Sequence, residues 1–350
     1  MASKALAIKY RPETWEDVVE QDSAKIILQQ QLESGEVKHA YLFCGGAGTG
    51  KTTCARIFAK EINKGEGHPI EMDAASNSGV DDVRNIIQQA KTKSLDSEYK
   101  VFIIDECHSI SNTGWQAFLK LIEEPPAKSI FIFCTTDPQK IPKTILSRVQ
   151  RYDFQRISQQ GIVDRLWYIL EQEDKGDKFN SDIVWVKDAI EYIAKIADGG
   201  MRDAISLMDK CLAYSKDLTL ENVVAALGTT DYDTMFNLLD TLLNKNSNCA
   251  IGIIEDIYNS GKDLKQFVNQ FIRFLLDIAK YGLGCEWKYI QIPRLEDYER
   301  WLKASDDDEF ESVQKWLSTF INLQSDIKWS QSVKYDVEAT ILLECNYYAE

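Results

Sequence analysis

Residues 44–56 read CGGAGTGKTTCAR. Four of them (Gly45, Gly50, Lys51 and Thr52) fit the phosphate-loop pattern G-x-x-x-x-G-K-[ST] without a gap. The glycines of such a loop let backbone N–H groups converge on phosphate oxygens, while the lysine can reach the β- and γ-phosphates and the threonine can ligate Mg²⁺. The stretch therefore predicts a nucleotide site lined by Gly45, Gly46, Ala47, Gly48, Thr49, Gly50, Lys51, Thr52 and Thr53.

The sequence on either side of the loop supports the same interpretation. Residues 40–43 (AYLF) are typical of a buried strand, and residues 54–62 (CARIFAKEI) are typical of a helix. The loop thus lies where a strand leads into a helix N-terminus, whose free N–H groups and dipole favour anions. A glycine turn without function is the alternative, and this context disfavours it.

A pair of acidic residues follows a second apolar run. Residues 100–104 (KVFII) predict a strand, which delivers Asp105 and Glu106 at its C-terminal end, the edge where open parallel sheets bind ligands. Beside a phosphate loop, Asp105 is expected to hold Mg²⁺ and Glu106 to polarise the attacking water. The role of His108 stays open between a nucleotide or DNA contact and a packed or solvent-exposed position.

Two further polar positions follow the later strands. Residues 129–135 (SIFIFCT) predict another buried strand, so that Thr135 and Thr136 would end near the γ-phosphate. Residues 145–151 (ILSRVQR) predict a short helix that carries Arg148 on the rim of the domain. Such an arginine is either an ordinary surface charge or acts on the γ-phosphate of a neighbouring subunit.

The segment before the first strand is a candidate wall for the base. Residues 9–21 read KYRPETWEDVVEQ, and their position before a nucleotide fold is suited to covering the adenine. Packing of the same residues against the core is an equally good interpretation. The residues expected to contact the base are Tyr10, Arg11, Pro12, Val18 and Val19.

Composition limits the class of protein. The 350 residues suffice for two or three domains, and no apolar run is long enough to span a membrane, so we expect a cytoplasmic protein without a membrane partner. The sequence has eight cysteines but no C-x-x-C pair, which argues against a disulfide framework or a zinc knuckle. Residues 1–157 carry 20 Lys and Arg against 21 Asp and Glu, whereas residues 158–350 carry 20 against 34. This acid excess either repels nucleic acid from the second half or is ordinary solubilising surface charge.

After Arg156 the apolar spacing predicts helices only. A first group forms a small bundle at residues 159–173, 181–197, 202–214 and 219–227. A second group follows at residues 232–244, 249–260, 263–281, 298–304, 309–323 and 332–347.

Together these residues resemble the γ/τ subunits of bacterial DNA polymerase III clamp loaders, within the AAA+ clamp-loader family. The resemblance extends over residues 8–230. The matching motifs, in chain order, are KYRPETWEDVVEQ, HAYLFCGGAGTGKTT, DAASNSGVDDVR, FIIDECH, LKLIEEPP, CTTDPQKIPKTILSR and GGMRDAISLMDK.

The resemblance implies a fold of three parts. These are an α/β AAA+ P-loop ATPase domain with a parallel sheet flanked by helices (residues 1–157), an all-α lid domain (residues 158–228) and an all-α collar domain for oligomerisation (residues 229–350). It also implies that Thr136 senses the γ-phosphate, that Arg148 is an arginine finger acting in trans, and that Arg202 reaches the nucleotide from the lid. Lys51, Asp105 and Glu106 complete the implied catalytic set.

The sequence departs from the family pattern at two places that bear on ligands. Bacterial members usually carry a four-cysteine zinc module before the DAAS strand, whereas residues 63–69 (NKGEGHP) join the flanking elements directly, so no zinc is expected. Relatives can have basic residues where this chain has Asn77 and Gly79. Its DNA contacts are therefore expected at helix N-termini and hydroxyls, with Ser78, Asn112 and Thr113 as candidates.

The resemblance implies an ATP- and Mg²⁺-dependent clamp-loader subunit of DNA replication. Its expected partners are other clamp-loader subunits in a ring or spiral, a pentamer by analogy, together with a sliding clamp and primer–template DNA. A non-hydrolysing AAA+ scaffold subunit is the alternative, although such subunits generally lose phosphate-loop or acid residues that this chain keeps. A branch-migration motor is a third interpretation, which the motifs and helical layout disfavour.

Overall fold

The computed structural model describes residues 4–77, 79–94, 96–176, 184–228, 232–286, 289–290, 298–299, 301 and 307–346. The chain divides into two compact units, one formed by Met1–Ile183 and Ile193–Asp209 and the other by Val184–Tyr192 and Lys210–Glu350. The expected three-domain division stays a prediction.

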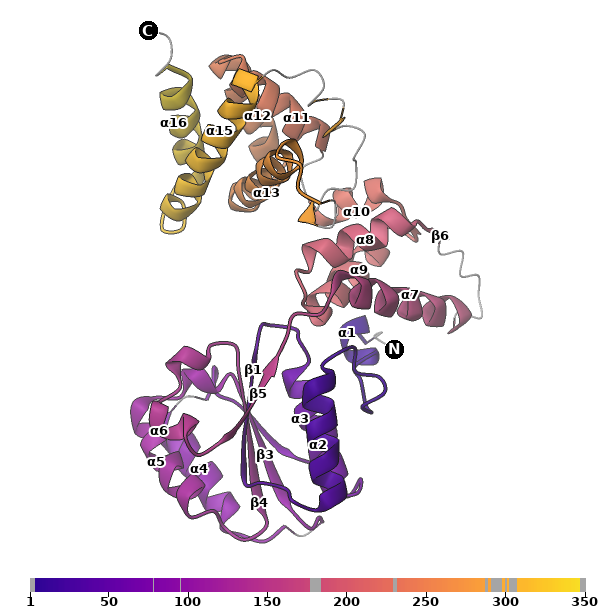
Figure 1. Cartoon of the computed structure of the whole chain (residues 1–350), viewed down its shortest axis with the longest axis vertical. Coiled ribbons are helices and arrows are strands. Elements are labelled where there is room, and N and C mark those ends of the chain that lie inside the picture. The colour runs from indigo at the N-terminus through magenta and orange to yellow at the C-terminus, as the bar shows by residue number, and fades with distance from the viewer. Residues whose placement is uncertain are drawn as a thin grey trace. The chain divides into compact units, whose positions relative to one another are not determined.

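A parallel five-stranded sheet forms the centre of the first unit (Figure 1). Its strand order is β2-β3-β4-β1-β5, so β4 lies between the strand before the phosphate loop and the strand before the acid pair. Register pairs Cys44 with Thr135 and Ile104 with Phe133, which brings the three C-terminal ends to one edge. The strands are β1 Ala40–Gly45, β2 Ile70–Asp73, β3 Lys100–Asp105, β4 Ser129–Thr135 and β5 Gln150–Phe154.

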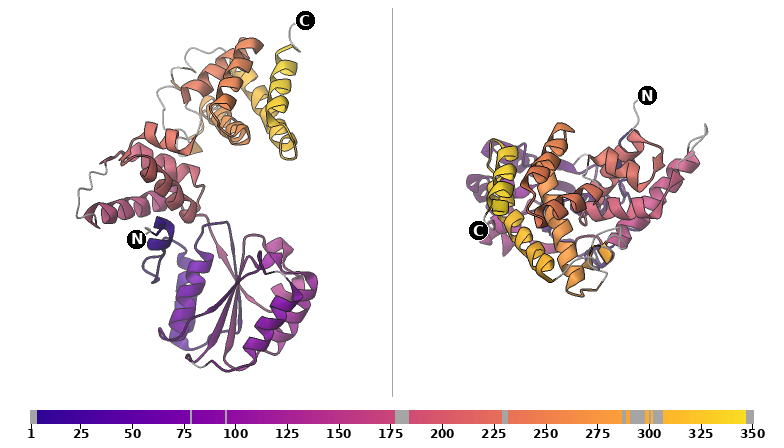
Figure 2. Two further views of the ribbon diagram at one scale, coloured as in Figure 1. Left: turned by 180° about the vertical axis from the view of Figure 1, so that it is seen from behind. Right: turned by 90° about the horizontal axis from the view of Figure 1, so that it is seen from above.

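Alternate residues of the strands pack into two separate hydrophobic cores. Leu42, Phe102 and Phe131 face a cluster that includes residues of α4, α5 and α6, whereas Phe43, Ile103 and Ile132 face a cluster with residues of α2 and α3. The view from behind shows the sheet between these two helical layers (Figure 2). Strands buried on both faces are expected to read as continuous apolar runs, as β3 and β4 do.

The helical segments of this unit begin with α1 Leu6–Lys9, α2 Asp22–Ser34, α3 Lys51–Ile62, α4 Val80–Ala90, the 3₁₀ turn η1 Cys107–Ser109 and α5 Asn112–Glu123. They continue with η2 Pro138–Lys140, α6 Lys143–Leu146 and α7 Gln159–Gly176. Two helices, α8 Lys187–Ile196 and α9 Met201–Tyr214, have residues in both units.

One element prediction in the ATPase region was wrong. The expected helix over residues 145–151 ends at Leu146, and the chain then enters strand β5, which pairs in parallel with β1. Only Tyr152 and Phe154 of β5 are buried, because it is an edge strand with one apolar side. Two inward-facing residues in five are too weak a period-2 signal to identify a strand beside a helical pattern.

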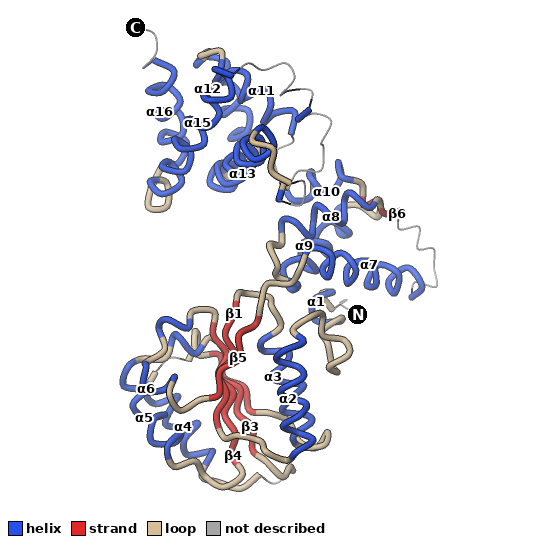
Figure 3. Tube along the Cα trace, viewed as in Figure 1, coloured by secondary structure: helices blue, strands red, loops and turns tan. Residues whose placement is uncertain are grey.

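The second unit is mainly helical (Figure 3). The prediction of helices only after Arg156 was wrong at one place. Residues 184–185, inside the helix predicted at residues 181–197, form strand β6 Val184–Trp185, which pairs in parallel with β7 Asp217–Leu218. Most of the helix predicted at residues 298–304 lies outside the described residues. The other helices are α10 Leu220–Leu227, α11 Tyr232–Leu243, α12 Ser247–Asn259, α13 Leu264–Gly282, α15 Asp307–Asp326 and α16 Val333–Asn346.

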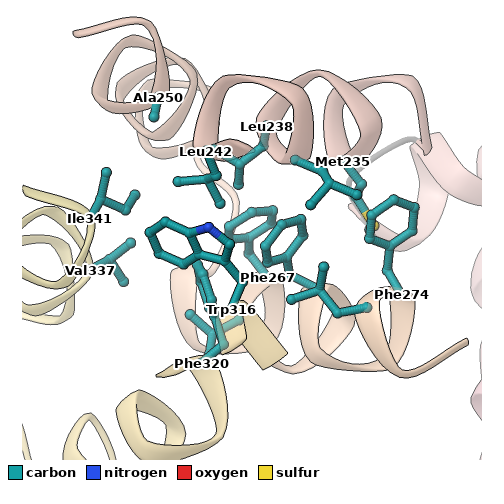
Figure 4. Packing of buried hydrophobic residues seen from close by; sticks show 14 of the residues in the cluster. Met235, Leu238, Leu242, Ala250, Phe267, Phe274, Trp316, Phe320, Val337 and Ile341 are labelled. Atoms are coloured by element: carbon teal, nitrogen blue, oxygen red, sulfur yellow. The ribbon is translucent and has the colours of Figure 1, made fainter. Parts of the chain in front are cut away.

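Aromatic and aliphatic side chains of α11, α12, α13, α15 and α16 share one core (Figure 4). Phe271 of α13 stacks on Phe267 and Phe274 and meets Phe320 of α15 edge-on at 4.8 Å between ring centroids. Apolar residues at three-to-four spacing thus bury one face of each helix. Among the helices of the described residues, none combines the length and apolar character needed to cross a membrane.

We expect Phe131→Ala to destabilise the first unit by about 3–5 kcal/mol, because truncating a buried phenylalanine loses apolar burial and leaves a cavity. Phe131 is 0% exposed and stacks on Phe102 at 5.0 Å between ring centroids. Urea unfolding followed by circular dichroism measures the effect. Ile27→Ala on α2, at a side chain that is 42% exposed, is the matched control and should change stability by about 0.5 kcal/mol or less. Equal effects of the two substitutions would contradict this account of the core.

Candidate functional site

A cavity of about 270 Å³ lies within the first unit at the C-terminal edge of the sheet. Its lining combines the phosphate loop, the acid pair, the N-terminal segment and residues of α7 and α9. Most of the residues predicted to bind nucleotide meet here, namely Tyr10, Arg11, Pro12, Val18, Val19, Ala47, Gly48, Thr49, Gly50, Lys51, Thr52, Thr53, Asp105, Glu106 and Arg202.

The phosphate loop takes a conformation that needs glycine. Gly48 and Gly50 have φ of +69° and +98°, a region that side chains disfavour, and Gly50 is the N-cap of α3. A Cβ atom on Gly48 would lie 3.0 Å from the Cα atom of Gly200. The loop therefore presents backbone groups at a helix N-terminus, with no room for a side chain at Gly48.

The Lys51 ammonium lies within the loop. Its Nζ atom donates hydrogen bonds to the carbonyl oxygens of Gly45 and Gly46, at 2.9 and 2.7 Å. Lys51 is only 6% exposed, and burial lowers its pKa below the usual lysine value, although the nearby Cys134 and Glu106 oppose part of that shift. A buried cation at this place fits an anionic ligand such as a phosphate chain.

The loop and the acid pair are joined by a direct hydrogen bond. Thr52 Oγ1 donates to Asp105 Oδ2 at 2.7 Å, and the other carboxylate oxygen of Asp105 accepts from the Glu106 backbone N–H at 3.0 Å. A hydroxyl and a carboxylate are the hard oxygen donors that Mg²⁺ prefers, and Mg²⁺ takes its remaining ligands from water and phosphate. These two residues therefore fit the predicted Mg²⁺ site. The expectation that no zinc is bound stays a prediction.

Thr136 lies beside the second acid. Its hydroxyl donates to Glu106 Oε2 at 2.9 Å, because β4 ends between the loop strand and the acid strand. The His108 Nδ1 atom lies 3.2 Å from the same carboxylate oxygen and 3.3 Å from Thr135 Oγ1. Of the two interpretations left open for His108, these contacts favour the packed one.

The predicted base wall is fixed to α7. The Tyr10 hydroxyl donates to Glu173 Oε1 at 2.5 Å, and Arg165 Nη2 donates to the Tyr10 carbonyl at 3.0 Å. Burial, and then the Glu173 carboxylate, raise the pKa of Tyr10 above its usual value, so that it stays a donor. The N-terminal segment is thus held at the cavity by side chains far away in sequence.

Residues of α9 reach the cavity through a turn that contacts the phosphate loop. The Met201 backbone N–H donates to the Gly48 carbonyl at 3.0 Å, and Arg202 follows directly. Several lining residues were not predicted from the sequence, because they come from helix faces and loop positions whose orientation only the fold decides. These are Ala7, Asp17, Ile157, Arg165, Met201, Asp203 and Ile205.

Arg148 is not among the described residues that line the cavity. Its Nη2 atom pairs with Glu123 Oε1 at 2.8 Å, and its Nη1 atom donates to the Thr144 carbonyl at 2.8 Å. The side chain is 39% exposed, so Arg148 is accessible from outside its own unit. This position agrees with a role at another subunit's nucleotide, which stays a proposal.

The candidate DNA residues are only partly described. Asn112 and Thr113 are exposed in the first turn of α5, whose cap is Ser111, since Ser111 Oγ accepts from the Gly114 N–H at 3.2 Å. Ser78 lies outside the described residues. The first turn of α5 therefore offers an exposed amide and an exposed hydroxyl to a ligand.

Three family models match consecutive parts of the chain. "DNA polymerase III, delta subunit" matches residues 68–158, and "DNA polymerase III clamp loader subunit, ATPase lid domain" matches residues 161–217. "DNA polymerase III subunits gamma and tau domain III" matches residues 218–343.

Curated relatives are similar over nearly the whole chain. DNA polymerase III subunit tau of Bacillus subtilis is 34% identical over 99% of this chain and 64% of its own length. The tau subunit of Escherichia coli is 30% identical over 98% of this chain and 55% of its own length. The gamma subunit of Buchnera aphidicola is 28% identical over 98% of both chains. The chain thus spans 55% to 64% of the length of these two tau subunits, which is less than two thirds.

Solved structures with a similar fold include the branch-migration motor RuvB of Thermotoga maritima. One RuvB structure has a TM-score of 0.50 and is 20% identical in sequence, and the match covers 67% of this chain and 79% of the RuvB chain. A similarity at that level of identity concerns the fold alone. Another has a TM-score of 0.50 and 18% identity over 75% of this chain and 90% of its own. The parallel sheet carries a phosphate loop, and the family models for the clamp-loader lid domain and for gamma/tau domain III match the residues that follow it, one after the other. The chain belongs to the γ/τ family of DNA polymerase III clamp-loader subunits.

Proposed function

We propose that this chain is an ATP-hydrolysing clamp-loader subunit that helps to open a sliding clamp and place it on primer–template DNA. The observation that carries the proposal is the 2.7 Å hydrogen bond from Thr52 to Asp105, which joins the phosphate loop to the acid pair. The cavity around that bond combines a buried cation, two oxygen donors and an apolar wall. Family membership provides the context of DNA replication.

Phosphate binding is assigned to the loop and to Lys51. Backbone N–H groups at the start of α3 would bind phosphate oxygens, with Lys51 exchanging its carbonyl partners for them. Thr52 and Asp105 would hold Mg²⁺, which when bound neutralises charge that develops on the phosphates. Tyr10, Pro12 and Val19 would cover the base.

Hydrolysis is assigned to Glu106 and Thr136. The Glu106 carboxylate would accept a proton from the attacking water, while the Thr136 hydroxyl holds that carboxylate at the end of β4. Phosphoryl transfer needs mainly positioning and electrostatic stabilisation, so a group fixed on rigid strand ends suits the task. Arg202, which lines the cavity from α9, would also contact the phosphates.

Arg148 is proposed to act on the nucleotide of a neighbouring subunit. Its exposed position outside the cavity of its own unit supports this assignment, and an arginine supplied in trans can accelerate phosphoryl transfer by about 10³–10⁵. Such a mechanism requires an assembly of subunits in a ring or spiral, which we propose to be a pentamer. The helices of residues 229–350 are proposed as its collar.

We expect Glu106→Gln to lower the rate of ATP hydrolysis by about 10²–10⁴, because the amide cannot accept the proton from water. The variant keeps an oxygen that can accept the Thr136 hydrogen bond, so ATP affinity should change by less than about threefold. Single-turnover hydrolysis and equilibrium ATP titration measure the two quantities. An unchanged hydrolysis rate would contradict the assignment of Glu106.

We expect Arg148→Ala to abolish the stimulation of hydrolysis by primed DNA and sliding clamp while ATP binding persists. The assay compares steady-state hydrolysis in the complex assembled with the other subunits, with and without DNA and clamp. Lys143→Ala is the matched control, because it removes an exposed cation from the short helix α6, which ends two residues before Arg148. Stimulation that survives in Arg148→Ala would refute the role in trans. A wild-type complex that never hydrolyses ATP would instead favour the non-hydrolysing scaffold.

We expect the double substitution Asn112→Ala with Thr113→Ala to weaken DNA stimulation by at least about threefold, since it removes two polar groups beside the free N–H groups of α5. Hydrolysis without DNA should not change. Gln116→Ala, at an exposed position one turn further along α5, serves as the control. DNA stimulation equal to that of wild type would reject these two residues as DNA contacts.

A further inference from the structure

Glu20 and Gln21 form an unusual pair beside the cavity. Both have left-handed backbone conformations, with φ of +56° and +59°, directly after Val19 and before α2. Such a conformation is uncommon for residues other than glycine, and it persists where surrounding contacts hold it in place. Both side chains reach the same target, residues 155–158, which connect β5 to α7.

Gln21 binds the first residue after β5 through both atoms of its amide. Its Nε2 atom donates to the Gln155 carbonyl at 2.8 Å, and its Oε1 atom accepts from the Gln155 N–H at 3.0 Å. The same Nε2 atom lies 3.4 Å from the Thr49 carbonyl in the phosphate loop. Gln21 is 8% exposed, so loss of this side chain would leave buried backbone groups without their partner.

Glu20 binds the other end of the connecting segment. Its carboxylate accepts from the Ser158 backbone N–H at 3.1 Å and from the Ser158 hydroxyl. The same hydroxyl oxygen accepts from the Gly161 N–H at 3.0 Å, which caps the first turn of α7. The two side chains together therefore fix the segment at both ends.

The opposite side of this segment carries the turn that leads to Arg202. The Ile157 N–H donates to the Gly199 carbonyl at 3.1 Å, and the Arg156 guanidinium pairs with the Asp198 carboxylate. Beyond that turn, the Met201 N–H donates to the Gly48 carbonyl. A continuous series of contacts thus runs from Gln21 through residues 155–158 to the residue before Arg202.

We propose that Glu20 and Gln21 are positioning residues for Arg202. By fixing residues 155–158, they hold the turn at residues 198–200 against the phosphate loop, and this determines where the Arg202 side chain meets the nucleotide. Small displacements of a charged group at a binding site cost a large part of its effect, so the contribution of Arg202 depends on this support. The inference rests on the proposed binding of ATP in this cavity.

A double-mutant cycle in the full chain tests the proposal. ATP affinity is measured by calorimetric titration with Mg²⁺ for wild type, Gln21→Ala, Arg202→Ala and the double variant. We expect Gln21→Ala to weaken ATP binding about tenfold when Arg202 is present and less than about twofold when Arg202 is replaced by alanine. The reason is that Gln21 affects ATP only through the position of the Arg202 side chain. The same tenfold loss in both backgrounds would overturn the proposal.

Two further variants separate positioning from general stability. Glu20→Gly removes the carboxylate, but glycine adopts the left-handed conformation readily, so the variant should fold normally. Its affinity for ATP should nevertheless be several-fold lower than that of the wild type. Gln31→Ala removes another glutamine that joins α2 to β5, through Gln150 Oε1 at 2.8 Å and the Tyr152 hydroxyl at 3.2 Å. It should lower the melting temperature while ATP affinity stays within twofold. If ATP affinity instead falls with melting temperature across all variants, the proposal fails.

Hydrogen exchange without nucleotide separates this inference from the proposed function. Gln21→Ala should accelerate exchange of the Ile157 and Met201 amides by at least about tenfold, whereas Gln31→Ala should leave them unchanged. A wild-type chain that binds no ATP would refute the proposed function, and the exchange result would still decide whether Gln21 holds the turn. Unchanged exchange of both amides in Gln21→Ala would overturn the positioning role.

Discussion

The hydrogen bond between Thr52 and Asp105 depends on one constraint, the strand order of the parallel sheet. Parallel strands place all their C-terminal ends at one edge, and ligands of open α/β sheets bind there. Because β4 lies between β3 and β1, its last residues reach the space between the acid pair and the phosphate loop. The contact between Thr136 and Glu106 is a direct consequence.

The sheet can hold these groups steadily because it is buried on both faces. Alternate residues of β1, β3 and β4 pack into the two hydrophobic cores. Aromatic contacts, such as that between Phe102 and Phe131, connect neighbouring strands. Close-packed protein interiors resist small displacements. The polar groups at the strand ends therefore lie on a rigid support. Hydrogen bonds and ion pairs with residues distant in sequence hold the N-terminal segment and the turn before α9.

Contacts that join distant parts of the sequence complete the cavity. Glu173 and Arg165 of α7 hold the segment that contains Tyr10, and Glu20 and Gln21 hold the two ends of the connection between β5 and α7. Each partner lies more than 130 residues from the other in sequence. Helix α7 and the connection before it consequently contact both the segment of the proposed base wall and the residues beside the proposed phosphate site.

The sequence by itself determined the elements whose chemistry is local. The glycine and lysine spacing of residues 45–52, the acids after an apolar run and the γ/τ motifs identified the fold and most of the cavity lining, because phosphate binding requires those residue types at that spacing. Only the tertiary structure decided which helix faces complete the cavity, that Arg148 pairs with Glu123, and that residues 150–154 form an edge strand. Those features depend on contacts between residues far apart in the chain, which local periodicity does not encode.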